Sequence, residues 1–348
     1  MQEAQKLSVN LVTWNSLPYL ANFFAALGAQ DFREFTVTVI DNASTDGTAK
    51  WLEAEHPEVT VFRNFKNQGV ARAKNQALTL ALSRWPEEEY ARRYILTVNP
   101  DIELAPDCLG KLVSQLEEDA GLDSCGPKLF RAYTKAEEDG ARESERTNIL
   151  DSTGSFIARS RRVVERGAGQ EDDGRYDGKP EVFGVNGTCV VYRAAALMAA
   201  KLDGEFFDED FFMYYEDADL AWRMRRFGMR AAFVPQAHAW HNRASAELRG
   251  RGRFRSRRAY GTQSKAVYLQ ARNALWLWLK NDEGLNRLAH LPWIAGSCIT
   301  QGLAALFSWS RLTGFFGACG GAWKIWRKRR MFGSRIKLRG AELRRWLV

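Results

Sequence analysis

Short apolar runs alternate with amphipathic segments through the first hundred residues, and this alternation restricts the possible folds more than any other feature. The predicted strands span Leu7–Thr13, Thr36–Ile40, Val59–Phe62 and Tyr94–Val98. Helices are expected between them, at 17–27, 45–55 and 70–82. Repeats of strand, helix and strand at this spacing are typical of parallel strands joined by crossover helices. The sequence therefore predicts an α/β fold built on a mostly parallel sheet with helices on its faces.

The pattern continues less regularly beyond residue 100. A helix, a strand, a helix and a last strand are expected at 106–118, 182–192, 216–227 and 231–235. Residues 135–180 are charged and rich in glycine, without a clear hydrophobic period. Such a segment is typical of an excursion from a sheet, not of a second core. We therefore expect it to be mobile.

Charge divides the chain into two parts. The 348 residues carry a net charge of +8, but 243–348 contain 22 Lys and Arg against 4 Asp and Glu, a net of +18. The preceding 242 residues have 28 basic and 38 acidic side chains, a net of −10. We expect a catalytic domain at 1–242 and a basic, tryptophan-rich helical region at 243–348. An excess of basic side chains favours a polyanionic partner, either nucleic acid or an anionic membrane surface.

The cysteines and the first residues indicate a cellular compartment. Five cysteines are scattered without a C-x-x-C pair, which argues against a disulfide framework or a zinc site. We therefore expect a reducing compartment. The opening residues run into a strand pattern without an apolar signal segment, so no secretory signal is expected.

The basic region contains two features that suit a membrane surface. Residues 291–310 carry no formal charge over 20 positions, which is nominally enough to span a bilayer. Their content of Gly, Ser, Thr, Gln and Pro favours interfacial or re-entrant helices over a span. An Arg-rich stretch at 249–258 precedes them, and a cluster of aromatic and basic side chains follows, typical of an interfacial anchor: Trp323, Lys324, Trp326, Arg327, Lys328, Arg329 and Arg330. A solvated basic helix packed on the body is the alternative.

A first polar cluster follows the second predicted strand, in Asp41-Asn42-Ala-Ser44-Thr-Asp46-Gly47. Ligands of open α/β sheets bind at the carboxyl ends of strands. A carboxylate there can accept the N3–H of a uracil or thymine ring, while N–H groups at the start of a helix face phosphate. A turn built from Asn, Asp and Gly is the alternative interpretation.

A second cluster, Asn99-Pro100-Asp101, ends the apolar strand at 94–98. Side chains two positions apart in an extended segment project on the same side, so the oxygens of Asn99 and Asp101 can share a cation. Oxygen donors suit Mg²⁺ or Mn²⁺, whose charge would hold a nucleotide diphosphate and stabilise it as a leaving group. The alternative is a Pro-Asp turn.

A third cluster follows an aromatic run and comprises Glu216, Asp217 and Asp219. Acids in the first turn of a helix also offset its dipole, but three of them beside five aromatic residues favour one acting as a general base on a hydroxyl. His241 lies 24 residues beyond Asp217 and is a candidate third metal ligand, with His238 a weaker competitor.

Taken in order, these motifs resemble the inverting family 2 glycosyltransferases of the GT-A fold, which is Rossmann-like, and particularly their rhamnosyltransferase-like branch. The resemblance covers about residues 7 to 245. It rests on Val12-Thr-Trp-Asn-Ser16, Val39 to Gly47, Asn67-Gln-Gly-Val-Ala-Arg72, Asn99-Pro-Asp101, Gly126-Pro-Lys-Leu129 and Phe207 to Leu220. Their shared order and spacing make the set specific.

The resemblance implies a role for each site residue. Asp41 would bind the nucleotide base, and the donor site would be lined by Thr13, Asn15, Asn42, Ser44, Arg72 and Asn99. Asp101, Asn99 and His241 would bind Mg²⁺ or Mn²⁺, with Asn99 standing where the family's D-x-D motif has its first carboxylate. Asp217 of the Glu216–Asp217 pair would be the catalytic base.

The same resemblance implies the substrates. The donor is expected to be a nucleotide-diphospho-sugar, with dTDP-L-rhamnose the first guess, and the acceptor a polyprenyl-diphosphate-linked saccharide. The reaction would take place at the cytoplasmic face of the cell membrane, in polysaccharide assembly. A donor carrying another sugar on UDP or GDP, with a soluble or protein acceptor, remains an alternative. A nucleic-acid-binding protein is a remote one, because no RNP motif, helix-turn-helix pattern or zinc spacing accompanies the basic run.

Overall fold

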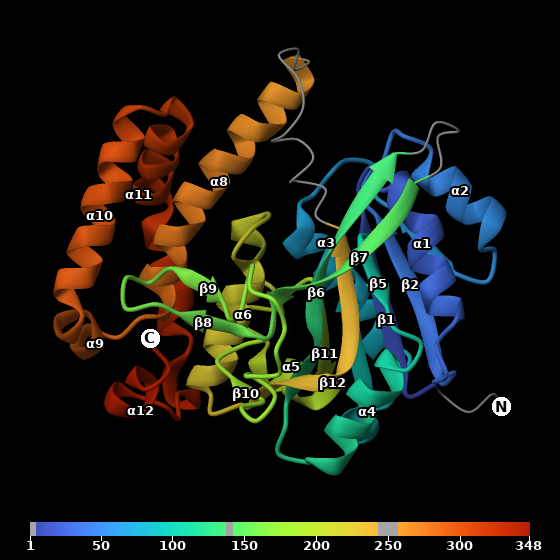
Figure 1. The fold of residues 1–348 in the computed structure, drawn as a ribbon. Coiled ribbons are helices and arrows are strands. Elements are labelled where there is room, and N and C mark those ends of the chain that lie inside the picture. The colour runs from blue at the N-terminus through green and yellow to red at the C-terminus, as the bar shows by residue number, and fades with distance from the viewer. Residues whose placement is uncertain (1–4, 137–141, 243–256) are drawn as a thin grey trace.

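The computed structural model describes residues 5–136, 142–242 and 257–348 (Figure 1). Twelve strands are described: β1 (Leu7–Thr13), β2 (Phe35–Asp41), β3 (Thr60–Arg63), β4 (Tyr94–Val98), β5 (Ile102–Leu104), β6 (Ser124–Ala136), β7 (Arg142–Ser152), β8 (Ser155–Ile157), β9 (Val163–Glu165), β10 (Glu181–Val182), β11 (Cys189–Arg193) and β12 (Ala231–Asn242). The helices that precede residue 242 are α1 (Leu17–Gly28), α2 (Thr48–Glu55), α3 (Val70–Leu82), α4 (Cys108–Glu118), α5 (Ala194–Ala200) and α6 (Glu216–Arg226), with short 3-10 helices η1 (Glu87–Arg92) and η2 (Glu209–Phe211).

One large sheet organises these elements, in the order β10-β12-β6-β11-β4-β1-β2-β3. β3, β2, β1 and β4 pair in parallel, and β12 pairs in parallel with β6. β11 lies between β4 and β6 and is antiparallel to both, so β6 runs in the same direction as β4. Six strands of this sheet therefore point their carboxyl ends to one edge. This confirms the predicted α/β fold.

Two cores cover the two faces of the sheet. Side chains of α1, α2 and α4 pack with β1 and β4 on one face, around Leu7, Val9 and Leu11 of β1. On the other face, α3, α5 and α6 pack around Ile95 and Val190. β4 is buried along its whole length, which explains its largely apolar sequence: a strand covered on both faces needs no polar alternation.

The structure corrects the predictions for three later segments. Residues 135–180 are not a loose excursion throughout, because β7 pairs with β6 and β8 pairs with β9. Residues 182–192 are not one strand, because a loop separates β10 from β11. The last strand continues from 231 to 242 instead of ending at 235, with a shift in register between Val234 and His238. That extension is what carries His241 back to the sheet edge.

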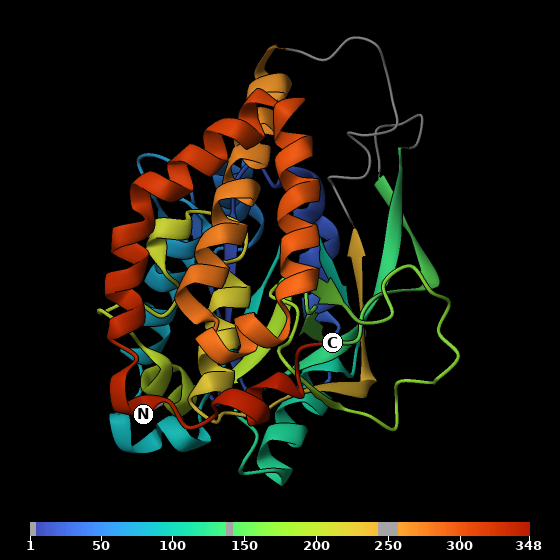
Figure 2. The same cartoon turned by 90° about the vertical axis from the view of Figure 1, so that its left-hand side faces the viewer.

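The C-terminal region is helical and packs on the body. It comprises α8 (Arg257–Asn281), α9 (Gly284–Ala289), α10 (Leu291–Leu306), α11 (Trp309–Arg330), a 3-10 helix η3 (Gly333–Arg335) and α12 (Gly340–Arg344). Figure 2 shows α8, α10 and α11 in front of the sheet. A shared core contains Phe211 and Trp222 of the body with Trp276, Ile325 and Leu347. Of the Arg-rich stretch at 249–258, residues 249–256 lie outside the described residues.

Candidate active site

Asp41 ends β2 as a fully buried carboxylate with several donors around it. The Thr13 hydroxyl, at the end of the neighbouring β1, donates to its Oδ1 at 3.1 Å, and the Ser44 backbone N–H donates to its Oδ2 at 3.2 Å. The Ser44 hydroxyl also donates to Oδ1, and Arg63 Nε lies 3.6 Å from Oδ2. Thr13, Asp41 and Ser44 thus form one cluster at the carboxyl ends of two parallel strands.

Asn15 and Asn42 are used to shape the loops around this cluster. Asn15 adopts a positive φ of 53°, and its Oδ1 accepts from the Thr45 backbone N–H at 2.8 Å. Asn42 is buried, donates to Asn67 Oδ1 and the Gly69 carbonyl, and accepts from Asn64 Nδ2 and the Gln68 N–H. Because these bonds use its amide fully, Asn42 supports the 64–69 loop.

Arg72, the remaining predicted donor-site residue, lies in the first turn of α3. Its side chain is largely exposed, and its Nε is 3.7 Å from Glu209 Oε2. Whether it contacts a donor stays a prediction.

Asp101 and His241 meet at the same sheet edge. The Asn242 N–H donates to the Asp101 carbonyl at 2.8 Å, which aligns the end of β12 with the turn after β4. His241 Nε2 lies 3.4 Å from Asp101 Oδ2, and His241 Nδ1 lies 2.8 Å from Asp151 Oδ2. Burial lowers the pKa of His241, but the hydrogen bonds and charges of Asp101 and Asp151 outweigh it and raise that pKa to about 9.

Asp101 and His241 could bind a divalent cation together with oxygen atoms of a bound phosphate. Asp101 Oδ1 is buried and has no hydrogen-bond partner among the described residues, so it is available to a cation. Asp151 holds the other ring nitrogen of His241, as carboxylates commonly do for metal-bound histidines. Within the described part of the chain, no cluster of three or more His, Cys, Asp or Glu is close enough to bind a metal by itself. Asp101 and His241 therefore offer a partial site, which phosphate oxygens and water would complete.

Glu216 and Asp217 begin α6 and have different surroundings. Glu216 is buried, and Lys74 Nζ donates to its Oε1 at 3.1 Å. Burial raises the pKa of Glu216, with Asp217 adding to the rise and Lys74 opposing it. Asp217 is partly exposed, and its carboxylate accepts a hydrogen bond from the Ala218 N–H of the same helix. Of the two carboxylates, Asp217 is the more exposed, and its role as the base stays a prediction.

The turn at 186–188 connects Asp217 with the Asn99–Asp101 segment. A Cβ atom built on Gly187 would lie 2.3 Å from Asp217 Oδ2, so only glycine leaves room for this carboxylate. The next residue, Thr188, accepts a hydrogen bond on its carbonyl from the Asn99 N–H at 2.8 Å. The predicted base and the predicted metal-binding segment are therefore close to each other.

The backbone before α6 is strained. Phe212, Tyr214 and Tyr215 have φ values of 65°, 70° and 67°, in a region that bulky side chains rarely adopt. Each such residue costs about 1–3 kcal/mol, and strain of this kind clusters at functional sites. The Phe212 carbonyl accepts from the Ala71 N–H at 3.2 Å and abuts Gly69, so the segment that precedes Asp217 also touches the start of α3.

The predictions from the sequence missed several residues of this site. Asp151 lies near the end of β7, within a segment expected to be mobile, yet it is fully buried against His241. Glu165 accepts hydrogen bonds from the Ser152 and Ser155 hydroxyls, and its pKa is raised by burial, with Asp217 contributing to the rise. The charged, aperiodic sequence of 135–180 contained no signal for either position. Gly187, in Asn-Gly-Thr, had at least the signature of a turn.

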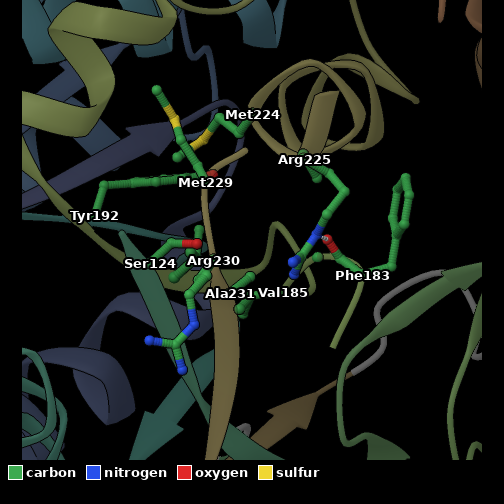
Figure 3. A pocket seen from close by; sticks show the side chains of 12 residues that line it. Ser124, Phe183, Val185, Tyr192, Met224, Arg225, Met229, Arg230 and Ala231 are labelled. Atoms are coloured by element: carbon green, nitrogen blue, oxygen red, sulfur yellow. Dashed lines mark hydrogen bonds between the residues drawn. The ribbon is translucent and has the colours of Figure 1, made fainter. Parts of the chain in front are cut away.

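A small pocket lies at the opposite edge of the sheet. Figure 3 shows Met224 and Arg225 of α6 near Ser124 and Ala231, which begin β6 and β12. Its volume of about 10 Å³ is room for about one water molecule. The pocket contains none of the predicted site residues.

The C-terminal aromatic and basic cluster does not face solvent as a whole. Lys328 is buried, with its Nζ 3.0 Å from Glu205 Oε2 and 2.9 Å from Asp210 Oδ2, and it also contacts Asp208. The prediction that Lys328 faces a membrane is therefore wrong. Arg329 is half-buried and donates to the carbonyls of Leu279 and Lys280. The exposed members are Trp323, Lys324, Trp326, Arg327 and Arg330.

Neither α10 nor any other helix in the described ranges combines the length and the apolar character needed to cross a membrane.

A mixed sheet in which six strands end at one edge, flanked by helices, has the architecture of the GT-A class of glycosyltransferase folds. The sequence agrees with that class. The family model for glycosyl transferase family 2 matches residues 8–198, and the chain belongs to this family.

Curated relatives include a rhamnosyltransferase and a hexosyltransferase. The N-acetylglucosaminyl-diphospho-decaprenol L-rhamnosyltransferase of Mycobacterium tuberculosis is 26% identical over 275 residues, which cover 78% of this chain and 86% of that protein. The low-salt glycan biosynthesis hexosyltransferase of Haloferax volcanii is 22% identical over 268 residues, covering 77% and 73%. The chain is thus similar to a rhamnosyltransferase over most of its length.

Solved structures confirm the fold. Residues 1–349 of Staphylococcus aureus TarS superpose with a TM-score of 0.54 at 17% identity, covering 92% of this chain and 80% of that one. The mannosyltransferase PcManGT of Pyrobaculum calidifontis, solved with GDP-Man and Mn²⁺, gives 0.52 at 15% identity, covering 96% and 86%.

Proposed function

We propose that this protein transfers a sugar from a nucleotide-diphospho-sugar to a hydroxyl of a lipid-linked saccharide, with inversion at the anomeric carbon. The observation that carries the proposal is the 186–188 turn, which contacts Asp217 through Gly187 and the Asn99 backbone through Thr188. A candidate base and a candidate diphosphate-binding segment are thus held at one place. The similarity to a decaprenol-linked rhamnosyltransferase supports the acceptor class.

Each of these residues would have a separate role in binding the donor or in the transfer. Asp41, fixed by Thr13 and Ser44, accepts a hydrogen bond from the nucleotide base, while Asn15 and Asn42 shape the loops around it. Asp217 accepts the proton of the acceptor hydroxyl while that oxygen forms a bond to the anomeric carbon. The bond from that carbon to the diphosphate oxygen breaks, and its electron pair leaves with the diphosphate. A single displacement inverts the configuration.

Asp101 and His241, with Asn99 beside them, are the residues that would hold Mg²⁺ or Mn²⁺. The cation would supply positive charge to the departing diphosphate. The Mn²⁺ in the PcManGT structure supports this proposal, as does the buried Asp101 oxygen that lacks a hydrogen-bond partner among the described residues.

We propose dTDP-L-rhamnose as the donor and a polyprenyl-diphosphate-linked saccharide as the acceptor. The test is transfer of label from dTDP-rhamnose, UDP-glucose, UDP-galactose, UDP-GlcNAc and GDP-mannose into bacterial lipid extract, with Mg²⁺ or Mn²⁺ and with EDTA. Lipid-phase product from dTDP-rhamnose alone, absent with EDTA, is the expected result. Slow metal-dependent hydrolysis of one donor without lipid-phase product would refute the lipid acceptor. Neither transfer nor hydrolysis with any of the five donors would refute the proposed function.

Replacing His241 with alanine is expected to weaken Mn²⁺ binding in the presence of nucleotide diphosphate. Loss of outer groups around a metal already costs about 10- to 100-fold in affinity, and loss of a ligand should cost at least as much. Calorimetric titration of Mn²⁺ into the protein with dTDP measures the change. His238→Ala is the matched control, because His238 lies on the same strand and contacts the Pro235 carbonyl instead. Equal Mn²⁺ affinity in the two variants would contradict the assignment.

We also propose that the helices α10 and α11 attach the protein to the cytoplasmic face of the inner membrane. Their exposed apolar side chains include Ile299, Leu303, Leu306, Phe307, Trp309 and Phe316, with Phe307 91% exposed. Lys324, Arg327 and Arg330 are exposed on α11. With Lys328 and Arg329 turned inward, the attraction to an anionic leaflet falls from about 5 to about 3 kcal/mol at about 1 kcal/mol per basic residue. Apolar insertion must therefore contribute much of the binding.

Replacing Leu306 and Phe307 with serine is accordingly expected to reduce binding to vesicles containing anionic lipid by at least about tenfold. Burying a large apolar side chain stabilises by about 1.5–3 kcal/mol, and both side chains are lost in this variant. Cosedimentation with the vesicles at low salt is the measurement. Phe65→Ser is the control, since Phe65 is fully exposed on the loop after β3. Full recovery of the unmodified protein in the supernatant would overturn the proposal.

A further inference from the structure

The segment that leads into Asp217 is held by a helix from the C-terminal region. α8 is described from residue 257, beyond the part of the chain that the family model matches. Asn273 of α8 is fully buried, and its Nδ2 lies 2.9 Å from each of the carbonyl oxygens of Phe211, Met213 and Tyr214. The two N–H groups of one amide therefore lie within hydrogen-bond distance of three carbonyls of the strained segment.

Neighbouring residues of α8 hold both ends of that segment. Arg272 donates to the carbonyls of Asp210 and Phe211 at 2.9 and 3.1 Å. Lys280 Nζ donates to Asp208 at 2.6 Å, before the segment, and to Asp219 at 2.7 Å, in the first turn of α6. Asp217 thus lies between two points of attachment to the same helix.

The attachments matter because the segment does not hold its own shape. Phe212, Tyr214 and Tyr215 all have positive φ, a conformation that persists only where surrounding contacts impose it. Phe212 also contacts Gly69, which precedes α3. Without Asn273, the Phe211 carbonyl would keep its hydrogen bonds from Arg272 and the Met213 N–H, but the Met213 and Tyr214 carbonyls would lose theirs from Asn273. The backbone at 213–215 could then relax to commoner conformations.

We propose that Asn273 is a positioning residue for the catalytic base: it holds the 211–215 backbone so that Asp217 stays against Gly187. The C-terminal region is then a part of the active site and not only an anchor. The proposal rests on the function proposed for Asp217 above. Because α8 packs against α11, this arrangement would also couple Asp217 to the helices proposed to attach to the membrane.

The test compares Asn273→Ala and Asn273→Asp with Asn286→Ala. The aspartate has nearly the shape of asparagine but turns oxygen toward three carbonyls, so it separates hydrogen bonding from packing. Asn286 is the matched control: it is an equally buried asparagine of the C-terminal region, and it contacts Arg161 and Arg344 instead.

Both Asn273 variants should reduce kcat by about 100-fold, as expected for a reacting group displaced by about 1 Å. The donor KM and the affinity for dTDP should stay within about threefold, because Asp41 and Asp101 are untouched. Asn286→Ala should keep kcat. A kcat for Asn273→Asp within about threefold of the unmodified enzyme, or a parallel loss in Asn286→Ala, would overturn the proposal.

Amide hydrogen exchange supplies a readout that needs no substrate. Residues 208–217 should exchange at least about tenfold faster in both Asn273 variants and at the original rate in Asn286→Ala. Unchanged exchange there would reject the positioning role even if activity fell. Conversely, if the protein transfers no sugar but exchange responds as expected, the proposed function fails while the contact between α8 and the segment stands.

Discussion

Asp217→Asn is expected to abolish sugar transfer while leaving the donor bound. A positioned general base contributes about 10²- to 10⁴-fold to a rate, and asparagine has the size of aspartate but cannot accept the proton. Glu216 cannot replace it, because it is buried and engaged by Lys74 at 3.1 Å. The measurement is kcat with the active donor, together with the affinity for its nucleoside diphosphate.

The control for this variant is Asp173→Asn, an exposed aspartate paired with Arg175. It should leave both kcat and nucleotide affinity unchanged. An Asp217→Asn enzyme with more than a tenth of the original kcat would reject Asp217 as the base. Loss of nucleotide binding in the same variant would instead assign the carboxylate to the donor site.

Lys280→Met is expected to lower the free energy of unfolding by about 3–5 kcal/mol, the usual cost of removing one partner from a buried ion pair. Lys280 is fully buried between Asp208 and Asp219, so methionine fills its space and leaves two buried carboxylates without that ammonium. Urea unfolding at neutral pH measures the loss. Lys324→Met, at an exposed position of α11, should change stability by less than about 0.5 kcal/mol.

The decrease in the free energy of unfolding caused by Lys280→Met should become smaller at acidic pH. Burial alone would raise the pKa of Asp208, but Lys280 and Lys328 outweigh it and hold that pKa below its usual range. A carboxyl group whose pKa is lowered by folding stabilises the protein above its unfolded pKa of about 3.9 and loses that contribution as the pH falls toward the folded value. The difference between the two proteins is therefore largest above about pH 5. A difference below about 1 kcal/mol at about pH 7 would contradict the ion-pair assignment.

Predictions from the sequence succeeded where local pattern determines local structure. β1 and β4 have the predicted bounds, and α3 begins and ends as expected, at Val70 and Leu82. The apolar runs of β1 and β4, and the apolar period of α3 after Gly69, are properties of neighbouring residues, so no distant contact is needed to recognise them. The family resemblance implied that Thr13, Asp41 and Ser44 share one site, and the structure brings them together at the carboxyl ends of β1 and β2.

Predictions failed where a side chain's role depends on a distant partner. Asp151 looked like one charge among many in a loose segment, until the pairing of β7 with β6 placed it against His241. Lys328 looked like its basic neighbours, although its position on α11 turns it toward Asp208 and Glu205, more than a hundred residues earlier. Period and composition carry no information about which side chain of the basic stretch at the end of α11 meets acidic groups.

The sequence by itself determined the α/β class and the family, because ordered motifs on short local elements suffice for these. Only the tertiary structure decided that the basic C-terminal region is joined to the segment around Asp217. Asn273 and Lys280 contact carbonyls and carboxylates that lie some sixty residues or more away along the chain. Asn273 and Phe211, for example, are 62 positions apart. Such contacts depend on how α8 packs against α6, which no local pattern in either helix specifies.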